Sequence, residues 1–481
     1  MRYLLLFCLL VAADAVATPT EEYVEVGLRK QLFVDDYVVA KRSGVVRKLG
    51  EVTKANGGQP VFRDGRFYGT VLHDGGRFKM WYRHYESKNY GYAESTDGIH
   101  FEKWGLIKGI NFASDVNMSV TIDPHESDRK HRYKASYDAP GMAAGLAYSA
   151  DGFNWTPYNN GKAVTYRAAD TYNQIFWDGD ANTYRLFTRT DYGKGGGPLA
   201  KTAAKDFEVR GVRSMVNPDV KADPTNWTLV RQWYFDREGP KEYLRRQIYA
   251  LTDWIYHGVH FGLMSLYEYP SDVSEGKTTD PFRRHERDIM SFYIGTSRDA
   301  DTWDLSWVYS GTPFVPRGGD GCFDKDLVLP ASSIVTHDDR HWIYYEGATE
   351  RHGTFELEVP VEFKREHAIG LAWLRLDGFV ALVADDLPAT VETRPFKLEG
   401  STLEVNVDAI GGEFWVEVLD GDGQAIDGLS TGSAHKYRSV DELRLRPRWK
   451  GRRSLDSLQG KEIRLRFHLR NAKLYAFQIA S

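Results

Sequence analysis

Cysteine is scarce in this chain, which has only 2 among its 481 residues. Cys8 lies in an N-terminal apolar segment, so removal of that segment would leave Cys322 alone and no intramolecular disulfide could form. The fold must then depend on a large buried core. Because a lone cysteine is far more often a buried structural residue than a nucleophile, we expect a structural role for Cys322.

The sequence also lacks the features of several functional classes. The net charge is −5 with both signs spread along the chain, and no run of Lys and Arg suggests a nucleic-acid partner. Beyond the N-terminal segment no apolar run is long enough to span a membrane. No glycine-rich phosphate loop, G-x-S-x-G elbow or metal-binding histidine spacing is present. We therefore expect no nucleic acid, no membrane span and no required cofactor. Bound calcium stays possible, but the sequence does not indicate it.

The N-terminus has the pattern of a secretory signal peptide. Arg2 supplies a positive charge, residues 4–13 form a short apolar run, and residues 15–17 (AVA) form a cleavage signal. The small residues expected just before a lipoprotein cysteine are missing at Cys8. The sequence therefore predicts a signal peptide over residues 1–17, cleaved after Ala17, and a secreted or periplasmic protein.

Aromatic residues are abundant, at 14% of the chain with 13 Trp and 28 Tyr. β-Sheets favour aromatic residues, and sugar-binding surfaces also use them for stacking. Short alternating runs such as residues 78–82 (FKMWY) and 342–345 (WIYY) are typical of strands, and no long segment has a helical period. The predicted fold class is all-β.

A repeated unit determines the predicted architecture. A strand is followed by a Ser-x-Asp-Gly-like turn and an aromatic residue at 92–101 and 148–155, with a third copy at 295–303. A degenerate copy lies at 370–379 and a weaker one at 203–207. Five units of about 70 residues predict a five-bladed β-propeller over residues 25–387. A β-sandwich array and a β-helix are the alternatives, and the long, uneven spacing between copies argues against the β-helix.

The character of the sequence changes after residue 387. Short alternating strands are expected at 400–407, 414–419, 463–467 and 474–477, with a turn at 420–423 (DGDG). We therefore predict a β-sandwich over residues 388–481, with no acidic pair at an obvious catalytic position.

The best candidates for chemistry are carboxylates at the starts of the predicted first strands of the blades. Such acids would lie together at the mouth of the central channel, where concentrated negative charge is costly unless it is used. The strands predicted to open the blades are at 31–39, 115–120, 170–177, 242–249 and 324–329. The acids at their starts are Asp35, Asp36, Asp115, Asp170, Glu242 and Asp324.

Several further residues end strand-like runs. Glu346 follows the run at 342–345, and its ordinary alternative is a polar residue that ends a strand. Arg351 and His352 come shortly after it and could surround a substrate. Arg83, His84 and Arg189 also end apolar runs and could bind sugar hydroxyls, as could Asp324, although each has the ordinary alternative of pairing at the edge of a blade.

These features resemble a known group, the five-bladed propeller glycoside hydrolases of the invertase/levanase and arabinanase/xylosidase families. Residues 32–37 (LFVDDY) are similar to the opening of secreted bacterial proteins, common in planctomycetes, that are related to the N-terminal domain of the invertase/levanase family. Residues 377–382 and 474–478 are similar to that group as well. The flanking Asn, the Arg-Asp-Pro motif and the Glu-Cys motif of the invertase/levanase family are absent.

The resemblance implies a carboxylate mechanism on a poly- or oligosaccharide, because glycoside hydrolysis uses two acidic residues. Asp35 or Asp36 would be the base or nucleophile, Glu242 or Glu346 the general acid, and Asp115 or Asp170 the residue that adjusts the pKa of that acid.

Three other functions stay open at this point. Phosphorolysis would need a basic pocket, for which Arg245 and Arg246 are the candidates. A non-catalytic, lectin-like propeller would explain the absent family motifs. A protein-interaction scaffold would have an exposed apolar patch and an unremarkable central pocket.

Overall fold

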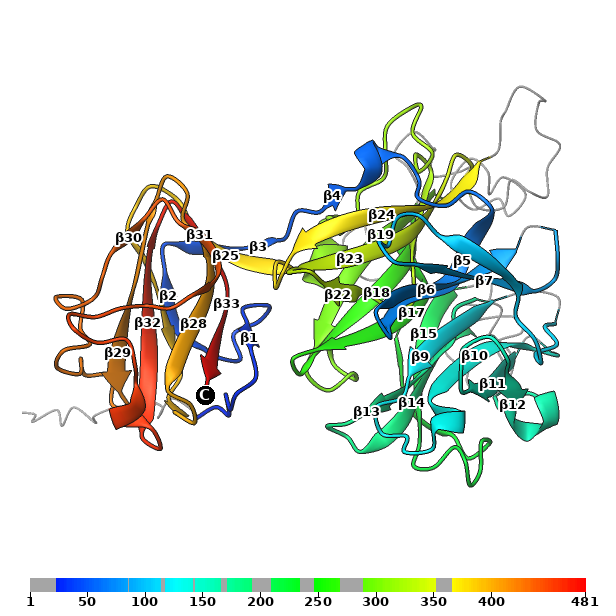
Figure 1. Ribbon diagram of the computed structural model, residues 1–481, viewed down its shortest axis with the longest axis horizontal. Helices are drawn as coiled ribbons and strands as arrows, with labels where there is room; N and C mark the ends of the chain where they lie inside the picture. Colours follow the sequence, from blue (N-terminus) through cyan, green and yellow to red (C-terminus); the bar gives the residue numbers. More distant parts are fainter. Residues whose placement is uncertain are drawn as a thin grey trace, which may run out of the picture. The chain divides into compact units, whose positions relative to one another are not determined.

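The computed structural model describes residues 23–84, 86–113, 117–141, 143–165, 171–192, 209–233, 246–268, 289–351 and 366–481 (Figure 1). Within these ranges the chain is nearly all β-structure, and the one α-helix, α1 (Ser306–Ser310), has little more than a single turn. The predicted all-β class is confirmed. The described 3₁₀-helices are η1 (Asn56–Gly58), η2 (Arg129–His131), η3 (Tyr158–Gly161) and η8 (Asp456–Leu458).

The chain forms two compact units. The larger unit comprises residues 47–381, and the smaller one joins the residues up to 46 with those from 382 onward. None of the described helices is long and apolar enough to cross a membrane.

Three four-stranded antiparallel sheets of the larger unit follow the chain order, each as a simple meander (Figure 1). Their strands are β5 (Gly65–Asp74), β6 (Arg77–His84), β7 (Tyr90–Ser95) and β8 (Glu102–Leu106); β9 (Met118–Ile122), β10 (Tyr133–Ala139), β11 (Ala143–Ser149) and β12 (Thr156–Pro157); and β13 (Gln174–Asp178), β14 (Thr183–Tyr192), β15 (Val209–Asn217) and β16 (Thr228–Trp233).

A nine-stranded sheet contains two further meanders. Its strands are β17 (Arg246–Tyr256), β18 (Val259–Glu268), β19 (Ile289–Ser297), β20 (Trp303–Asp304), β21 (Leu327–Pro330), β22 (Val335–His337), β23 (Arg340–Ala348), β24 (His367–Arg375) and β4 (Thr53–Lys54). One meander is β17 to β20, and the other consists of β21 and β22, then β23, β24 and β4. Because β4 comes from the start of the unit and pairs with β24 near its end, the two ends of the unit close within one sheet.

Hydrogen bonds join the first strands of neighbouring meanders. Val120 of β9 donates to Thr70 of β5 (2.9 Å), and Gln174 of β13 exchanges two hydrogen bonds with Asp253 of β17 (2.8 and 2.6 Å). Ser332, which follows β21, bonds back to Thr70. Thr121 of β9 donates to Ile175 of β13. The first strands therefore surround a common axis, which is the arrangement of a β-propeller. The described residues supply five meanders, and the count of five blades stays a prediction.

The repeated turn of the sequence adopts one conformation in three meanders, between the third and fourth strands. In each copy the aspartate Oδ1 accepts hydrogen bonds from the backbone N–H groups two and three residues later, and the residue after the aspartate has a positive φ. The copies are Asp97 with Gly98 (φ 72°), Asp151 with Gly152 (φ 80°) and Asp299 with Ala300 (φ 58°). The copy at 370–379 differs, because Asp377 itself takes the positive φ (62°). The copy at 203–207 lies outside the described residues.

These turns connect neighbouring blades. Trp81 of β6 donates to the carbonyl of Gly152 in the next blade (2.6 Å), and Tyr344 of β23 donates to that of Gly98 (2.7 Å). Arg185 of β14 reaches the carbonyl of Asp299 (3.0 Å) in the same way. The repeat therefore holds adjacent sheets together as well as turning the chain.

A second repeat lies where the first strand of each meander turns into the second, which we call the turn end. A Lys, Arg or His side chain near the start of the second strand bonds to an oxygen on the first strand or just after it. The pairs are Lys79 with Asp74 (2.8 Å), Lys134 with Asp123 (2.7 Å), Arg185 with Asp178 (2.6 Å), His260 with Asp253 (2.6 Å) and His341 with Thr336 (2.9 Å). Sequence analysis missed this repeat, because the loop between the paired residues varies in length.

The smaller unit is a β-sandwich of two six-stranded sheets. One sheet contains β3 (Val45–Leu49), β25 (Val380–Ala384), β33 (Ala472–Ala480), β28 (Thr402–Asp408) and β31 (Asp441–Leu445), with β1 (Gln31–Leu32) paired to β33. The other contains β2 (Val39–Ser43), β26 (Ala389–Thr393), β32 (Glu462–Arg470), β29 (Glu413–Asp420) and β30 (Tyr437–Arg438), with β27 (Phe396–Lys397) paired to β32.

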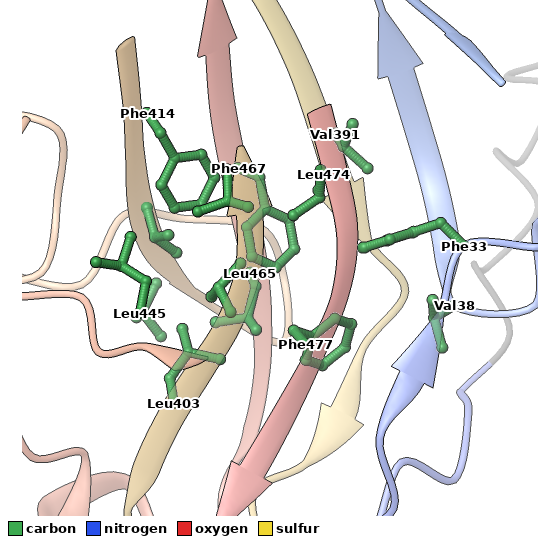
Figure 2. Packing of buried hydrophobic residues seen from close by; sticks show 14 of the residues in the cluster. Phe33, Val38, Val391, Leu403, Phe414, Leu445, Leu465, Phe467, Leu474 and Phe477 are labelled. Atoms are coloured by element: carbon green, nitrogen blue, oxygen red, sulfur yellow. The ribbon is translucent and has the colours of Figure 1, made fainter. Parts of the chain in front are cut away.

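Apolar side chains from both sheets fill the sandwich core (Figure 2). Phe33 packs between Phe467 and Phe477, with ring centroids 6.0 Å from each. Burying aromatic side chains of this size contributes about 1.5–3 kcal/mol each to stability, so the N-terminal segment is held firmly in this unit.

This placement corrects two sequence-based predictions. Residues 31–39 were expected to form the first strand of the propeller, but β1 pairs with β33 and β2 with β26 in the sandwich. The predicted boundaries, 25–387 and 388–481, are therefore wrong at the N-terminal side, and the true first strand is β5. Alternating apolar residues show that a segment forms a strand, but not which sheet it joins.

The two remaining expectations about single segments have different outcomes. Cys322, expected to be buried, is exposed. The predicted signal peptide over residues 1–17 lies outside the described residues and stays a prediction.

Candidate active site at the opening end of the propeller unit

At the end of each blade opposite the turn end, the first strand begins, the second strand ends and the third begins. We call this the opening end. Sequence analysis placed its candidate acids here, and the described residue with the most distinctive chemistry is Glu346, near the end of β23.

Glu346 occupies a central position in its sheet. Its backbone lies between Leu329 of β21 and Ile369 of β24, and only 2% of the residue is exposed. One carboxylate oxygen, Oε1, bonds to Nδ1 of His367 (2.7 Å). The other, Oε2, is buried without a hydrogen-bond partner among the described residues. An unpartnered buried carboxylate oxygen costs stability, so its retention points to a ligand as the partner.

His367 connects Glu346 to a second buried acid. Its Nε2 lies 2.5 Å from Oε1 of Glu350. In the antiparallel register His367 faces Ala348, and Glu346 and Glu350 lie two residues to either side of that position. Because Ala348 has a small side chain, the imidazole can extend across it to both carboxylates.

The pKa of His367 is raised above its ordinary value. Burial lowers the pKa and so does the charge of Arg66, but the hydrogen bonds to Glu346 and Glu350 outweigh both. The protonated imidazolium is therefore favoured, and its charge stabilises the carboxylates beside it.

Tyrosines from several blades form the wall around Glu346. Burial raises the pKa values of Tyr68, Tyr90 and Tyr172 well above the ordinary value, and the charge of Glu346 raises each further. Tyr172 bonds to the backbone of Gly69, and the hydroxyl of Tyr68 lies 2.6 Å from that of Tyr249. Glu346 therefore lies within electrostatic range of hydroxyl groups from two other blades, as a residue near the axis would.

Tyr90 also brings two other charged residues into this site. Burial makes the largest contribution and raises the pKa of Tyr90. The charge of Arg83 lowers this pKa, whereas the charges of Glu346 and Asp138 raise it. Asp138 is fully buried near the end of β10. Of the predicted substrate-binding residues, Arg83 thus lies beside Tyr90, which it faces in the antiparallel register of β6 and β7. Sequence analysis missed Asp138, although it ends a strand-like run just as Glu346 does.

Two other predicted residues hold the last blade together. Asp324 is buried and bonds to Lys54 of β4 (2.5 Å) and to the Tyr345 hydroxyl (3.0 Å), so it fastens the closing strand to the sheet. Arg351 lies 3.8 Å from Asp326.

His84 and Arg189 lie on second strands at the same end. His84 is half-buried with Nδ1 3.3 Å from the Ser87 hydroxyl, and Arg189 is buried in β14.

The two acids predicted as base or nucleophile lie elsewhere. Asp35 accepts a hydrogen bond from the backbone of Tyr37 (3.0 Å), and Asp36 is half exposed, 3.7 Å from Arg42. Both belong to the sandwich unit, so the structure contradicts their predicted place in the first blade. Asp115, Asp170, Glu242, Arg245 and His352 lie outside the described residues, and only the backbone of Arg246 is described.

His367 and Glu350 were also missed by sequence analysis. Glu350 comes two residues after the strand that contains Glu346, and His367 begins the following strand, so antiparallel pairing of two adjacent strands is the signal that could have found them. Within the described ranges no group of three or more His, Cys, Asp or Glu side chains is arranged to hold a metal ion.

Comparisons with known proteins add the following. No protein-family model matches the chain, and no curated protein matches it. Similar solved structures include a thermostable family-43 glycoside hydrolase, with 14% identity over 66% of this chain and 92% of that chain at a TM-score of 0.44. An exo-inulinase from Aspergillus awamori has 11% identity over 88% and 99%, at 0.38. The catalytic domain of a Coprinopsis cinerea GH62 α-L-arabinofuranosidase has 10% identity over 69% and 96%, at 0.40. Because these TM-scores are below 0.5, the similarities carry no argument about the architecture. The architecture described above rests on the strand pairing of this chain alone.

Proposed function

We propose that this protein is a secreted glycoside hydrolase that acts on a poly- or oligosaccharide through carboxylates at the opening end of its propeller. The observation that carries the proposal is Glu346, whose buried Oε2 has no hydrogen-bond partner among the described residues and whose charge acts on tyrosines of two other blades. Carboxylates and hydroxyl-bearing aromatic side chains together suit a ligand that has many hydroxyl groups and apolar ring faces.

The surroundings of Glu346 suit a negatively charged role. His367 holds one oxygen of Glu346 in a hydrogen bond (2.7 Å), and a carboxylate positioned in this way would act as nucleophile or as the base that activates water. This differs from the general-acid role expected from the sequence. The general acid would then come from Asp138, which the structure places near Tyr90, or from Asp115, Asp170 or Glu242, which carry over from the sequence.

The main alternative is a non-catalytic carbohydrate-binding propeller. Two other acids at the opening end already have partners within the protein, which favours this alternative. Asp324 pairs with Lys54, and Glu268 accepts hydrogen bonds from Ser291 and Tyr293 (both 2.5 Å). In a lectin, Glu346 would accept a hydrogen bond from a sugar hydroxyl without turnover.

The test is reducing-end release from a broad polysaccharide panel by wild type and Glu346→Gln. The substitution keeps the shape of the side chain and removes its charge, so we expect activity to fall by about 100- to 10,000-fold. Two control variants should keep full activity. Glu94→Gln changes another buried glutamate that bonds to a tyrosine (Tyr92, 2.7 Å), and Asp36→Asn changes an exposed acid of the sandwich.

Each outcome separates the alternatives. Full activity in Glu346→Gln would refute this site, and loss in all three variants would indicate a folding defect. If no substrate is cleaved, binding to the same panel, weakened by Glu346→Gln, would establish the lectin.

A further inference from the structure

His367 has more bonding demands than a neutral imidazole can meet. It lies between two carboxylates, with Nδ1 2.7 Å from Glu346 and Nε2 2.5 Å from Glu350. An ionised carboxylate accepts hydrogen bonds and cannot donate one, and a neutral imidazole carries a single N–H. Both contacts are satisfied by one imidazolium with two ionised acids, because only the imidazolium donates from both nitrogens.

Burial makes the loss of that second N–H consequential. The side chains of Glu346, Glu350 and His367 are 2%, 7% and 11% exposed, so water does not readily replace a lost hydrogen bond. Deprotonation of His367 would leave one of two buried carboxylates without its donor and the two negative charges without the cation between them. The carboxylate that carries the proposed chemistry would then lose its fixed orientation.

Among the described residues, the charged groups known to act on His367 are Glu346 and Glu350, from β23 and the residues after it, and Arg66 from β5, whose charge opposes protonation. On neighbouring elements, Glu366 pairs with Arg63, and Lys54 of β4 pairs with Asp324.

We propose that protonated His367 is a positioning residue that holds Glu346 in its reactive orientation, and that loss of its proton sets the upper pH limit of the activity. This inference rests on the proposed glycoside hydrolase function. Protonation favours activity here, so activity is retained at low pH until another group titrates and falls as pH rises through the titration of His367.

The test combines the pH profile of kcat/KM with the titration of His367 followed by NMR of labelled histidine. The key variant is Glu350→Gln, which leaves Glu346 and His367 in place and removes one of the two charges that stabilise the imidazolium. We expect the titration midpoint of His367 and the alkaline limb of the profile to move together to lower pH, by about one unit or more. His367→Gln, which cannot carry the charge, identifies the His367 resonance and should lower kcat/KM at every pH.

His131→Gln is the matched control, because His131 also bonds to a carboxylate (Asp128, 2.9 Å) but lies at the turn end. It should leave the alkaline limb unchanged. An active Glu350→Gln enzyme in which the His367 titration moves while the limb stays in place would overturn this inference and leave the proposed function intact. If neither moves, a limb that lies at a different pH from the His367 titration would overturn it in the same way. Absence of activity on every substrate at every pH would instead overturn the proposed function, and the pH limit with it.

Discussion

The two ends of the propeller blades differ in how regular they are. At the turn end, four meanders contain a buried or partly buried pair of a cation and a carboxylate at equivalent places, and the fifth has a hydroxyl instead. At the opening end, the chain of Glu346, His367 and Glu350 is found in one described blade only. A feature that every blade needs serves the fold, whereas a feature found in one blade is free to serve chemistry.

Two buried histidine–carboxylate contacts show the same difference. His260 and Asp253 are 2.6 Å apart at the turn end, and His367 and Glu346 are 2.7 Å apart at the opening end. Burial lowers the pKa of each histidine, and the carboxylates raise it by more. His260 belongs to the repeated series, whereas His367 has a second carboxylate and lies beside the tyrosine wall. A buried histidine–carboxylate contact therefore serves the fold at the turn end and is available for chemistry at the opening end, depending on the residues that surround it.

Breaking a turn-end pair should have the largest effect on stability. Lys134 is 2% exposed and bonds to Asp123 (2.7 Å) and Glu126 (3.2 Å), which are just as buried. Lys134→Met would leave the buried carboxylate of Asp123 without its cation, whereas Glu126 would keep Lys221 (3.1 Å). We expect the free energy of unfolding to fall by about 3–5 kcal/mol. Urea denaturation measures this loss.

The same variant also tests the separation of the two ends. The specific activity of the folded Lys134→Met protein should stay unchanged, because Lys134 lies at the turn end. A loss below about 1 kcal/mol would contradict the structural role of the pair, and a loss of kcat with intact stability would contradict the division between the ends.

Restoring the missing carboxylate should have a smaller and opposite effect. Thr336 of β22 faces His341 of β23 and bonds to its Nδ1 (2.9 Å). Thr336→Asp would complete the series with a charge-assisted hydrogen bond, which should stabilise the protein by about 1 kcal/mol. The gain in urea midpoint should disappear when Thr336→Asp is introduced into a His341→Ala protein and compared with His341→Ala alone. A destabilised single variant would show that the series is not an interchangeable repeat.

The repeated turns should give the smallest effect and a distinct pH dependence. Burial raises the pKa of Asp151, but hydrogen bonds from Asn154 and from the backbone of Phe153 lower it by more, so the net pKa is depressed. A depressed pKa stabilises the fold above the unfolded pKa of about 3.9, and this contribution is lost as pH falls. Asp151→Asn should therefore lower Tm slightly at neutral pH, with a difference that shrinks below about pH 4.

Thermal melts of both proteins from pH 7 to pH 3 measure this difference. Asp422→Asn, at an exposed turn of the sandwich, is the matched control and should show no such trend. A difference that stays constant across the range would mean that the charge of Asp151 makes no contribution.

Much of the propeller was visible in the sequence. The Ser-x-Asp turn is local, since its hydrogen bonds join residues two and three apart, and three copies fold as the repeat predicted. Four of the five predicted blade-opening segments overlap a first strand, namely β9, β13, β17 and β21. Glu346 could be singled out because it ends an aromatic strand.

What the sequence alone determined is what depends on near neighbours: the all-β class, the repeat, the turns and the candidate acid Glu346. What only the tertiary structure decided is which distant segments meet. Phe33 belongs to the sandwich because Phe467 and Phe477 enclose it. Asp324 pairs with Lys54 because β4 returns to the last blade. His367 reaches Glu346 because β23 and β24 pair in one register. The physical reason is that alternation and turn residues fix local conformation, whereas burial and pairing across hundreds of residues depend on complementary surfaces that no local pattern contains.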